Sequence, residues 1–247
     1  MKSHPGGRLE RHCSRATRTS ERLSTVGYVE SFAAFVAHEL RTPLATQRAL
    51  LELALADTTM DTLAWREIGA DALQACRQQE RLLEACLTLT RSRTGLQRSE
   101  PVDLATIAAD TVRAHDLGAL ERVVTLDRAW TRGDPDLVER LVSNLVSNAV
   151  RHNIAGGRVE IETRTERSHA VLSVTNTSAP VPAGELERLF QPFQRLAPKT
   201  NAFCDGAGMG LGLTIVRAIA DAHHALVAAR PGATGGLAID VAFRQLH

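Results

Sequence analysis

Apolar residues between positions 29 and 92 recur at the three- and four-residue spacing of amphipathic helices. One seam of this kind runs from about Val29 to Ala56, and a second runs from about Leu63 to Arg91. The segment Asp57–Asp61 between them is rich in residues that break helices. This arrangement predicts a long antiparallel helical hairpin. The seam positions are Ala33, Ala37, Leu40, Leu44, Leu51 and Leu55 in the first helix, and Ile68, Ala72, Ala75, Leu82, Cys86 and Leu89 in the second.

Each of these two seams is too long and too apolar for one partner helix to cover. Packing two hairpins into a four-helix bundle covers both seams. We therefore expect the chain to form a homodimer through residues of about 30–92.

From about Glu100 onward, short strand-like runs alternate with helical segments. The predicted strands are Val123–Leu126, Val159–Arg164, Ala170–Asn176, Leu226–Ala229 and Leu237–Phe243, and the predicted helices are Leu104–His115, Asp136–His152, Ala183–Leu189 and Leu211–His223. Helices interleaved with a mostly antiparallel sheet predict an α/β sandwich. The stretch Pro192–Asp205 has no periodic pattern, and a long segment of this kind within a compact domain is commonly a lid.

The expected fold class is therefore α+β, in which a helical hairpin precedes the α/β sandwich. We place a basic leader at 1–28, the hairpin at 29–96 and the sandwich at 97–247. Hydrophobic residues make up 44% of the 247 residues, which is enough for packed cores in both domains.

Charge and cysteine content exclude several classes of protein. The 29 basic and 28 acidic residues give a net charge of +1, so nothing indicates binding to nucleic acid. The four cysteines lack the spacing of metal ligands, which favours free thiols in a reducing cytosol. No apolar run approaches the ~18–20 residues that cross a bilayer. We therefore expect a soluble cytoplasmic protein, in which any part that senses across a membrane lies on a separate subunit or has been lost.

The first predicted helix carries the segment His38-Glu39-Leu40-Arg41-Thr42-Pro43-Leu44. His38 lies about a quarter-turn from the seam, so its imidazole is accessible and can attack a γ-phosphorus. Glu39 can orient the ring and accept its proton. Pro43 removes one helical hydrogen bond just after the histidine at a cost of ~3 kcal/mol. An ordinary surface histidine is the alternative, but the costly proline favours a phosphoryl acceptor.

Two asparagines of the predicted helix Asp136–His152 share one face, since Asn144 and Asn148 are four residues apart. A carboxamide oxygen can ligate Mg²⁺ that is otherwise held by substrate phosphates. Arg151 and His152 extend this polar face and can contact phosphate oxygens. The alternative is a solvated helix face without a ligand.

The glycine-rich run Gly206–Leu213 precedes a predicted helix, so its amides and the helix N-terminus can bind phosphate. It is not a Walker A motif, because no Gly-Lys-Ser/Thr sequence follows. It is not a dinucleotide fingerprint either, because the third glycine and the surrounding βαβ unit are missing. The alternative is a flexible turn.

Together these segments resemble the catalytic core of bacterial sensor histidine kinases of two-component systems, over roughly residues 30–245. The similar motifs are the H box at His38–Leu44, the N box at Asn144–Asn148, the F box at Leu189–Phe193 and the G2 box at Gly206–Leu213. The resemblance implies a dimerisation and phosphotransfer hairpin followed by a Bergerat-type ATP-binding domain.

The resemblance also implies roles for individual residues. His38 is the expected phosphoacceptor, Asn148 the expected ligand of Mg²⁺, and an aspartate in the receiver domain of a response regulator the expected recipient of the phosphoryl group. Thr42 is expected to align a water that dephosphorylates the regulator. The residues expected to contact ATP are Asn144, Asn148, Arg151, His152, Asn176, Phe193, Gly208, Gly210, Leu211, Gly212 and Leu213.

The chain departs from the family pattern at three places. The G1 box, usually Asp-x-Gly-x-Gly, reads Asn176-Thr177-Ser178-Ala179-Pro180, which predicts weaker adenine binding than aspartate gives, by about 1–2 kcal/mol. His152 stands where an aromatic residue is often found. His223-His224 stands where the family often has a Gly-Gly turn.

Two rival functions arise from the same residues. A conformational ATPase of the gyrase or Hsp90 type has a water-activating glutamate at the position of Asn144, so steady hydrolysis is disfavoured here. The second rival is a degenerate dimeric scaffold that sequesters a response regulator, which the altered G1 box favours and the intact histidine helix disfavours.

Overall fold

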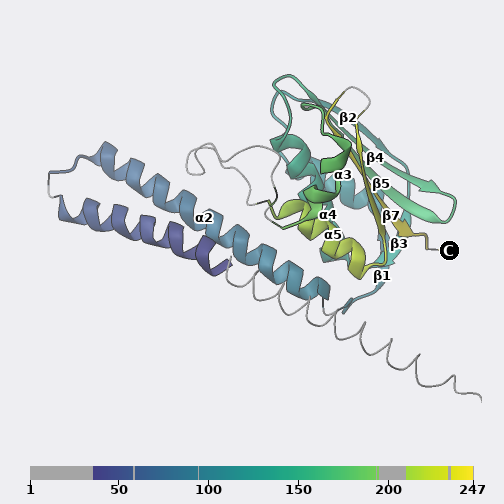
Figure 1. Cartoon of the computed structure of the whole chain (residues 1–247), viewed down its shortest axis with the longest axis horizontal. Coiled ribbons are helices and arrows are strands. Elements are labelled where there is room, and N and C mark those ends of the chain that lie inside the picture. Colours follow the sequence, from purple (N-terminus) through teal and green to yellow (C-terminus); the bar gives the residue numbers. More distant parts are fainter. Residues whose placement is uncertain are drawn as a thin grey trace, which may run out of the picture. The chain divides into compact units, whose positions relative to one another are not determined.

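The computed structural model describes residues 36–57, 59–93, 95–192, 194, 210–232 and 235–246 (Figure 1). The chain divides into two compact units, Met1–Leu83 and Glu84–His247, and each is described by itself.

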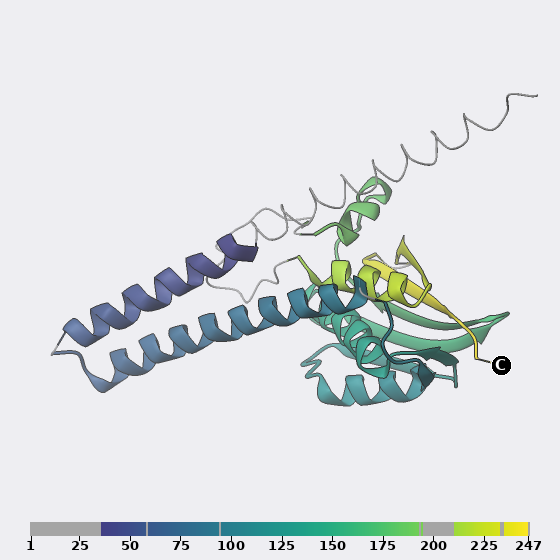
Figure 2. The same cartoon turned by 90° about the horizontal axis from the view of Figure 1, so that it is seen from below.

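The first unit contains the predicted helical hairpin (Figure 2). Its first helix is described over 36–56, and the second, α2, spans Thr62–Arg93 and continues into the second unit. The Asp57 carboxylate accepts hydrogen bonds from the backbone and hydroxyl of Thr59, which shapes the turn. Asp61 then caps α2 by accepting from the backbone N–H of Ala64 at 2.8 Å. The chain thus reverses where the sequence predicted.

The face of the first helix that packs within the hairpin is not the predicted seam. Pro43 and Ala54 are buried, and between them Gln47 donates a hydrogen bond to the carbonyl of Ala72 at 2.8 Å. The predicted seam residues Leu44, Leu51 and Leu55 are 56%, 40% and 74% exposed. In α2 the seam does turn inward, since Leu82 and Leu89 are buried. Within one hairpin the first helix therefore contacts α2 through the face that carries Pro43, Gln47 and Ala54, and the leucines of the predicted seam stay exposed in the single chain.

The second unit is built on a five-stranded sheet in the order β2-β4-β5-β7-β6. Its strands are β2 (Glu121–Leu126), β4 (Arg158–Glu166), β5 (His169–Asn176), β6 (Leu226–Pro231) and β7 (Leu237–Arg244). The β2–β4 pair is parallel and the other pairs are antiparallel. A separate two-stranded sheet pairs β1 (Glu100–Asp103) with β3 (Trp130–Gly133).

Three helices cover one face of the five-stranded sheet (Figure 1). They are α3 (Leu104–Ala114), α4 (Pro135–Arg151) and α5 (Gly212–Ala222). Asp134 caps α4 and proline occupies its first position, a combination that starts helices. The apolar face of α4 lies in the core, and its buried residues are Leu137, Val138, Leu141, Val142, Leu145, Val146 and Ala149. The predicted α+β class and α/β sandwich are confirmed.

Some predicted elements differ from the structure. The strands β1 and β3 were not predicted, because each is only four residues long and they pair mainly with each other. The predicted helix Ala183–Leu189 is two 3-10 helices, η1 (Ala183–Glu185) and η2 (Glu187–Phe190). Of the predicted lid, Pro192–Asp205, only Pro192 and Gln194 belong to the described residues. None of the helices in the described ranges combines the length and apolarity needed to span a bilayer.

Candidate active site

His38 lies on the helix described over 36–56 with its side chain exposed, and Glu39 beside it is half-buried. The hydroxyl of Thr42, one turn further, donates a hydrogen bond to the carbonyl of His38 at 3.3 Å. The Thr42 oxygen therefore has its proton directed to the backbone and can act toward solvent as an acceptor. The helix continues through Pro43, which has no N–H for the carbonyl of Glu39.

Asn144 on α4 is held against the start of α5. Its Nδ2 donates to the carbonyl of Arg140 at 2.7 Å, which fixes the direction of the carboxamide. A Cβ placed on Gly212 would lie 3.5 Å from Oδ1 of Asn144, so this oxygen faces the first residue of α5. The fold thus brings Asn144 beside Gly212, which lies at the end of the predicted glycine-rich segment.

Asn148 lies one turn further along α4 and is half-buried. Within the described residues, no hydrogen bond engages its carboxamide, whereas that of Asn144 is bonded. The same part of the chain has no cluster of three or more His, Cys, Asp or Glu side chains that could enclose a metal ion. These residues fit a Mg²⁺ ion bound through one amide oxygen and completed by phosphates and water, which is its common mode of binding.

No side chain of the described residues caps the N-terminus of α5. Leu211 stands at the N-cap without a capping side chain, and the first residue of the helix is Gly212. The first backbone N–H groups of a helix have no partner within it and bind anions readily. Gly210 just before it has a φ of 70°. Two predicted ATP contacts, Phe193 and Gly208, lie outside the described residues.

Asn176 ends β5 and is only 4% exposed. Its Nδ2 donates to the carbonyl of His152 at 3.0 Å and to that of Thr177 at 3.3 Å. Both N–H groups of the amide are thereby used, and Oδ1 remains as the acceptor. Arg151 and His152, at the end of α4, have exposed side chains.

Comparison with known proteins identifies two domain families and a set of relatives. Residues 28–95 match the His Kinase A (phospho-acceptor) domain, and residues 133–245 match the histidine kinase-, DNA gyrase B- and HSP90-like ATPase. The sensor protein CutS of Streptomyces coelicolor is 40% identical over 217 residues, which are 86% of this chain and 52% of CutS. The chain belongs to the sensor histidine kinases of two-component systems.

Other sensor histidine kinases show the same likeness. The sensor protein kinase PmrB of Pseudomonas aeruginosa is 34% identical over 232 residues, which are 90% of this chain and 47% of PmrB. The chain therefore spans about half the length of the curated relatives it matches. Among solved structures, the histidine kinase AdeS of Acinetobacter baumannii shares the fold over 85% of this chain and 98% of its own, with a TM-score of 0.66 and 19% identity.

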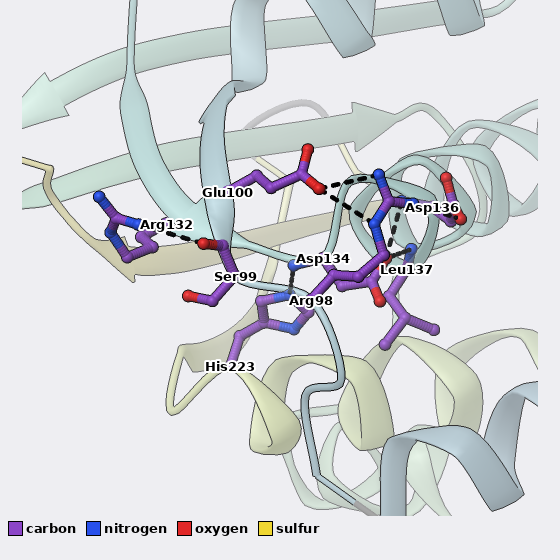
Figure 3. A network of polar contacts seen from close by, with 8 residues as sticks. All are labelled: Arg98, Ser99, Glu100, Arg132, Asp134, Asp136, Leu137 and His223. Atoms are coloured by element: carbon purple, nitrogen blue, oxygen red, sulfur yellow. Dashed lines mark hydrogen bonds and ion pairs between the residues drawn. The ribbon is translucent and has the colours of Figure 1, made fainter.

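Two features of this histidine kinase were not predicted from the sequence. His223 was noted only as a departure from a Gly-Gly turn, yet its ring is buried and joins the end of α5 to the start of α4 (Figure 3). Its Nε2 accepts from the backbone N–H of Asp134 at 3.0 Å, and its Nδ1 lies 2.8 Å from the carbonyl of Ile219. Gly133 is required beside it, because a Cβ there would overlap the imidazole.

The second unpredicted feature is the anchoring of the segment before β1 (Figure 3). Arg98 pairs with Asp136 at 3.0 Å and with Glu100 at 3.0 Å, and Arg132 donates to the carbonyl of Ser99 at 3.1 Å. Exposed pairs of this kind contribute about 0–1 kcal/mol each, so they orient the segment more than they stabilise the fold. The alternating charges in this part of the sequence could have suggested that ion pairs form, but not which residues form them.

The F-box region is fixed by α5. Arg217 stacks over the ring of Phe190 at 4.5 Å from its centroid and pairs with Glu187 at 3.5 Å. Both partners belong to η2. Arg217 of α5 therefore holds the short helix that precedes the predicted lid.

Proposed function

We propose that this chain is the catalytic core of an ATP-dependent protein histidine kinase. It transfers the γ-phosphoryl group of ATP to His38 and then to an aspartate in the receiver domain of a response regulator. The observation that carries the proposal is the N-terminus of α5, which has no capping side chain and lies beside the oxygen of Asn144, in a chain that also presents an exposed His38. The names of the relatives, sensor proteins and sensor kinases, do not favour the degenerate scaffold.

In the proposed reaction an imidazole nitrogen of His38 attacks the γ-phosphorus, and the bond from that phosphorus to the β–γ bridging oxygen breaks. ADP leaves with the electron pair, and Glu39 accepts the proton from the ring. The backbone N–H groups at the start of α5 bind the phosphate oxygens, and Asn148 would hold Mg²⁺. When bound, this ion would neutralise the negative charge that develops on the phosphates.

The exposed leucines of the first helix support a homodimer. Leu44, Leu51 and Leu55 keep between 40% and 74% of their surface exposed in one chain, and a second hairpin would cover them in a four-helix bundle. We place the boundary between the hairpin and the ATP-binding domain at 96/97, and the whole reaction in the cytoplasm. Dephosphorylation of the regulator through a water aligned by Thr42 belongs to the same proposal.

The test is incubation of the protein with γ-labelled ATP and Mg²⁺, followed by detection of acid-labile, alkali-stable phosphate on the chain. His38→Gln should abolish the label while leaving ATP binding intact, because the side chain is exposed and carries no core packing. Asn148→Ala should lose most labelling and its response to Mg²⁺. Labelling that persists in His38→Gln would refute the phosphoacceptor, and full labelling in Asn148→Ala would refute the metal ligand.

A further inference from the structure

The altered G1 box is tied to the end of the N-box helix by a dense set of hydrogen bonds. Asn153 lies in the turn between α4 and β4, and Thr177 follows the end of β5. The Thr177 hydroxyl donates to Oδ1 of Asn153 at 2.7 Å and accepts from the backbone N–H of Arg158 at 2.7 Å. We name the pair Asn153 and Thr177 the G1 clasp.

The hydrogen-bonding capacity of the clasp is filled. Nδ2 of Asn153 donates to the carbonyls of Ala149 and Arg158, at 3.1 Å each. Its Oδ1 accepts from Ile154 N–H at 3.0 Å as well as from Thr177. An amide has two donors and an oxygen with two acceptor sites, so all four are used. The orientation of Asn153 is thereby fixed, and an isosteric aspartate could not reproduce it.

Close backbone approach makes this clasp possible. A Cβ on Gly157 would overlap both Oδ1 of Asn153 and Oγ1 of Thr177. The G1 box of this chain lacks its usual glycines, and the glycine that the contact requires stands across from it, in the turn after α4. The G1 segment is therefore rebuilt around a different set of contacts.

We propose that the G1 clasp locks the carboxamide of Asn176 as a hydrogen-bond acceptor for the adenine amino group, so that aspartate cannot replace it. Thr177 is fixed by the clasp, and its carbonyl together with that of His152 takes both N–H groups of Asn176. Among the described residues, the hydrogen bonds of the Asn176 side chain are both donated by Nδ2, which leaves Oδ1 as the acceptor. Asn153 and Thr177 act here as positioning residues.

This inference rests on the proposed function and reverses the sequence-based expectation for position 176. An aspartate has the same shape but would set a carboxylate oxygen about 3.0 Å from the His152 carbonyl, the distance now spanned by Nδ2. Two acceptors would then face each other in a nearly buried place, which is unfavourable. Asparagine therefore binds adenine better than aspartate in this pocket.

The fixed orientation of the Asn176 carboxamide also predicts that the site prefers adenine to guanine. Guanine presents a carbonyl oxygen where adenine presents its amino group, so a fixed acceptor disfavours it. If the Thr177 hydroxyl is removed, the turn loosens and the Asn176 amide can rotate, which offers Nδ2 to the guanine carbonyl. Loss of the clasp should therefore weaken adenine binding and relax selectivity together.

The experiment is calorimetric titration of non-hydrolysable analogues of ATP and of GTP into the full chain. Asn176→Asp should bind the ATP analogue at least tenfold more weakly than wild type. Thr177→Val should bind it about fivefold more weakly and lose at least threefold of its preference for adenine over guanine, and Thr177→Ser should restore both. Thr165→Val is the matched control, because its hydroxyl also bonds a carbonyl, that of Arg128 at 3.2 Å, but on the far end of β4.

The outcomes separate the two proposals. Wild-type protein that binds neither analogue would refute the proposed function, and the clasp would then be judged by urea unfolding alone. In that case Asn176→Asp and Thr177→Val must still unfold at lower urea than Thr165→Val, or the clasp is refuted as well. Wild-type protein that binds the ATP analogue, with Asn176→Asp binding equally well or more tightly, would overturn the lock and leave the kinase assignment standing. If Thr177→Val kept the wild-type preference for adenine over guanine, the fixed orientation of Asn176 would likewise be overturned and the kinase assignment would stand.

Discussion

The helical hairpin and the sheet-containing unit differ in how far one chain can bury its apolar side chains. In the hairpin, Leu53, Leu55 and Leu63 are 65%, 74% and 66% exposed. In the sheet-containing unit, Leu141 and Ile161 are fully buried. Burial of one leucine side chain is worth about 1.5–3 kcal/mol. The sheet-containing unit therefore closes its core by itself, whereas the hairpin of one chain leaves large apolar side chains exposed.

This comparison makes the two units separable. A change at the exposed leucines should affect assembly and leave nucleotide binding alone, and a change inside the sheet-containing unit should do the reverse.

The largest effect is expected from Leu51→Glu combined with Leu55→Glu. In a dimer four leucines would be replaced by charges, at a cost of on the order of 1.5–3 kcal/mol for each lost burial and more for each buried charge. The dissociation constant of the dimer should rise by at least a thousandfold, so that light scattering at micromolar concentration reports a monomer. Binding of an ATP analogue should be unchanged.

Leu226→Glu provides the control for this prediction, since Leu226 is 67% exposed but lies on β6 of the sheet-containing unit. It should remain dimeric. A double variant that still has the mass of a dimer, or a wild-type protein that is already monomeric, would show that the exposed leucines do not form the dimer interface.

A smaller effect, confined to the sheet-containing unit, is expected from acidification. Burial lowers the pKa of His223, and His224 lowers it further, against the Ile219 carbonyl and the Asp134 carboxylate, which raise it. The neutral ring donates from Nδ1 to Ile219 and accepts at Nε2 from the Asp134 N–H, so a proton on Nε2 would set two donors against each other (Figure 3). Protonation therefore opposes the folded state.

The sign of the pH dependence follows from the direction of the shift. Because the folded-state pKa lies below the ordinary value of 6.5, the unfolded chain binds more protons in the window just below that value. The contribution of the neutral His223 ring to the free energy of unfolding is fully present above pH 6.5. It is lost as the pH falls from there to the folded-state pKa. Urea midpoints between pH 7.5 and 5 should fall in wild type and fall less in His223→Gln. Parallel curves for wild type and His223→Gln would contradict this account.

The sequence predicted most of the sheet-containing unit because its signals are local. Asp134-Pro135 and the apolar face of α4 predict a helix without reference to the rest of the chain. The strand β1 carries no such signal, since its pattern becomes meaningful only when β3 pairs with it. The contact of the first helix with α2 could not be predicted for a related reason, because Gln47 is an inward residue only through its bond to Ala72 on the other helix.

The candidate site divides in the same way. The paired asparagines and the glycine-rich turn could be predicted as ligands, since spacing alone places them on a helix face and before a helix. The orientation of Asn176 could not, because its partner is a backbone carbonyl of His152, twenty-four positions away. Chemistry that depends on residue type is readable from the sequence, whereas chemistry that depends on which way an amide points requires the fold.

The smallest effect is expected at the end of α5, where the sheet-containing unit departs from its family's glycines. His224 has a φ of 52°, its N–H bonds the Asp221 carbonyl at 3.0 Å, and the Ala225 N–H bonds the Ala220 carbonyl at 2.8 Å. These bonds form a Schellman motif, in which the left-handed position is usually glycine.

A left-handed conformation costs a side-chain-bearing residue roughly 1–2 kcal/mol, and the greater freedom of glycine in the unfolded chain offsets about 0.4–1 kcal/mol of that. His224→Gly should therefore raise the free energy of unfolding by about 0.5 kcal/mol in urea titrations at pH 8, while His224→Ala, which keeps a Cβ, should not. A glycine variant less stable than wild type would mean that the His224 side chain itself stabilises the unit, and that its departure from the family pattern has a structural benefit.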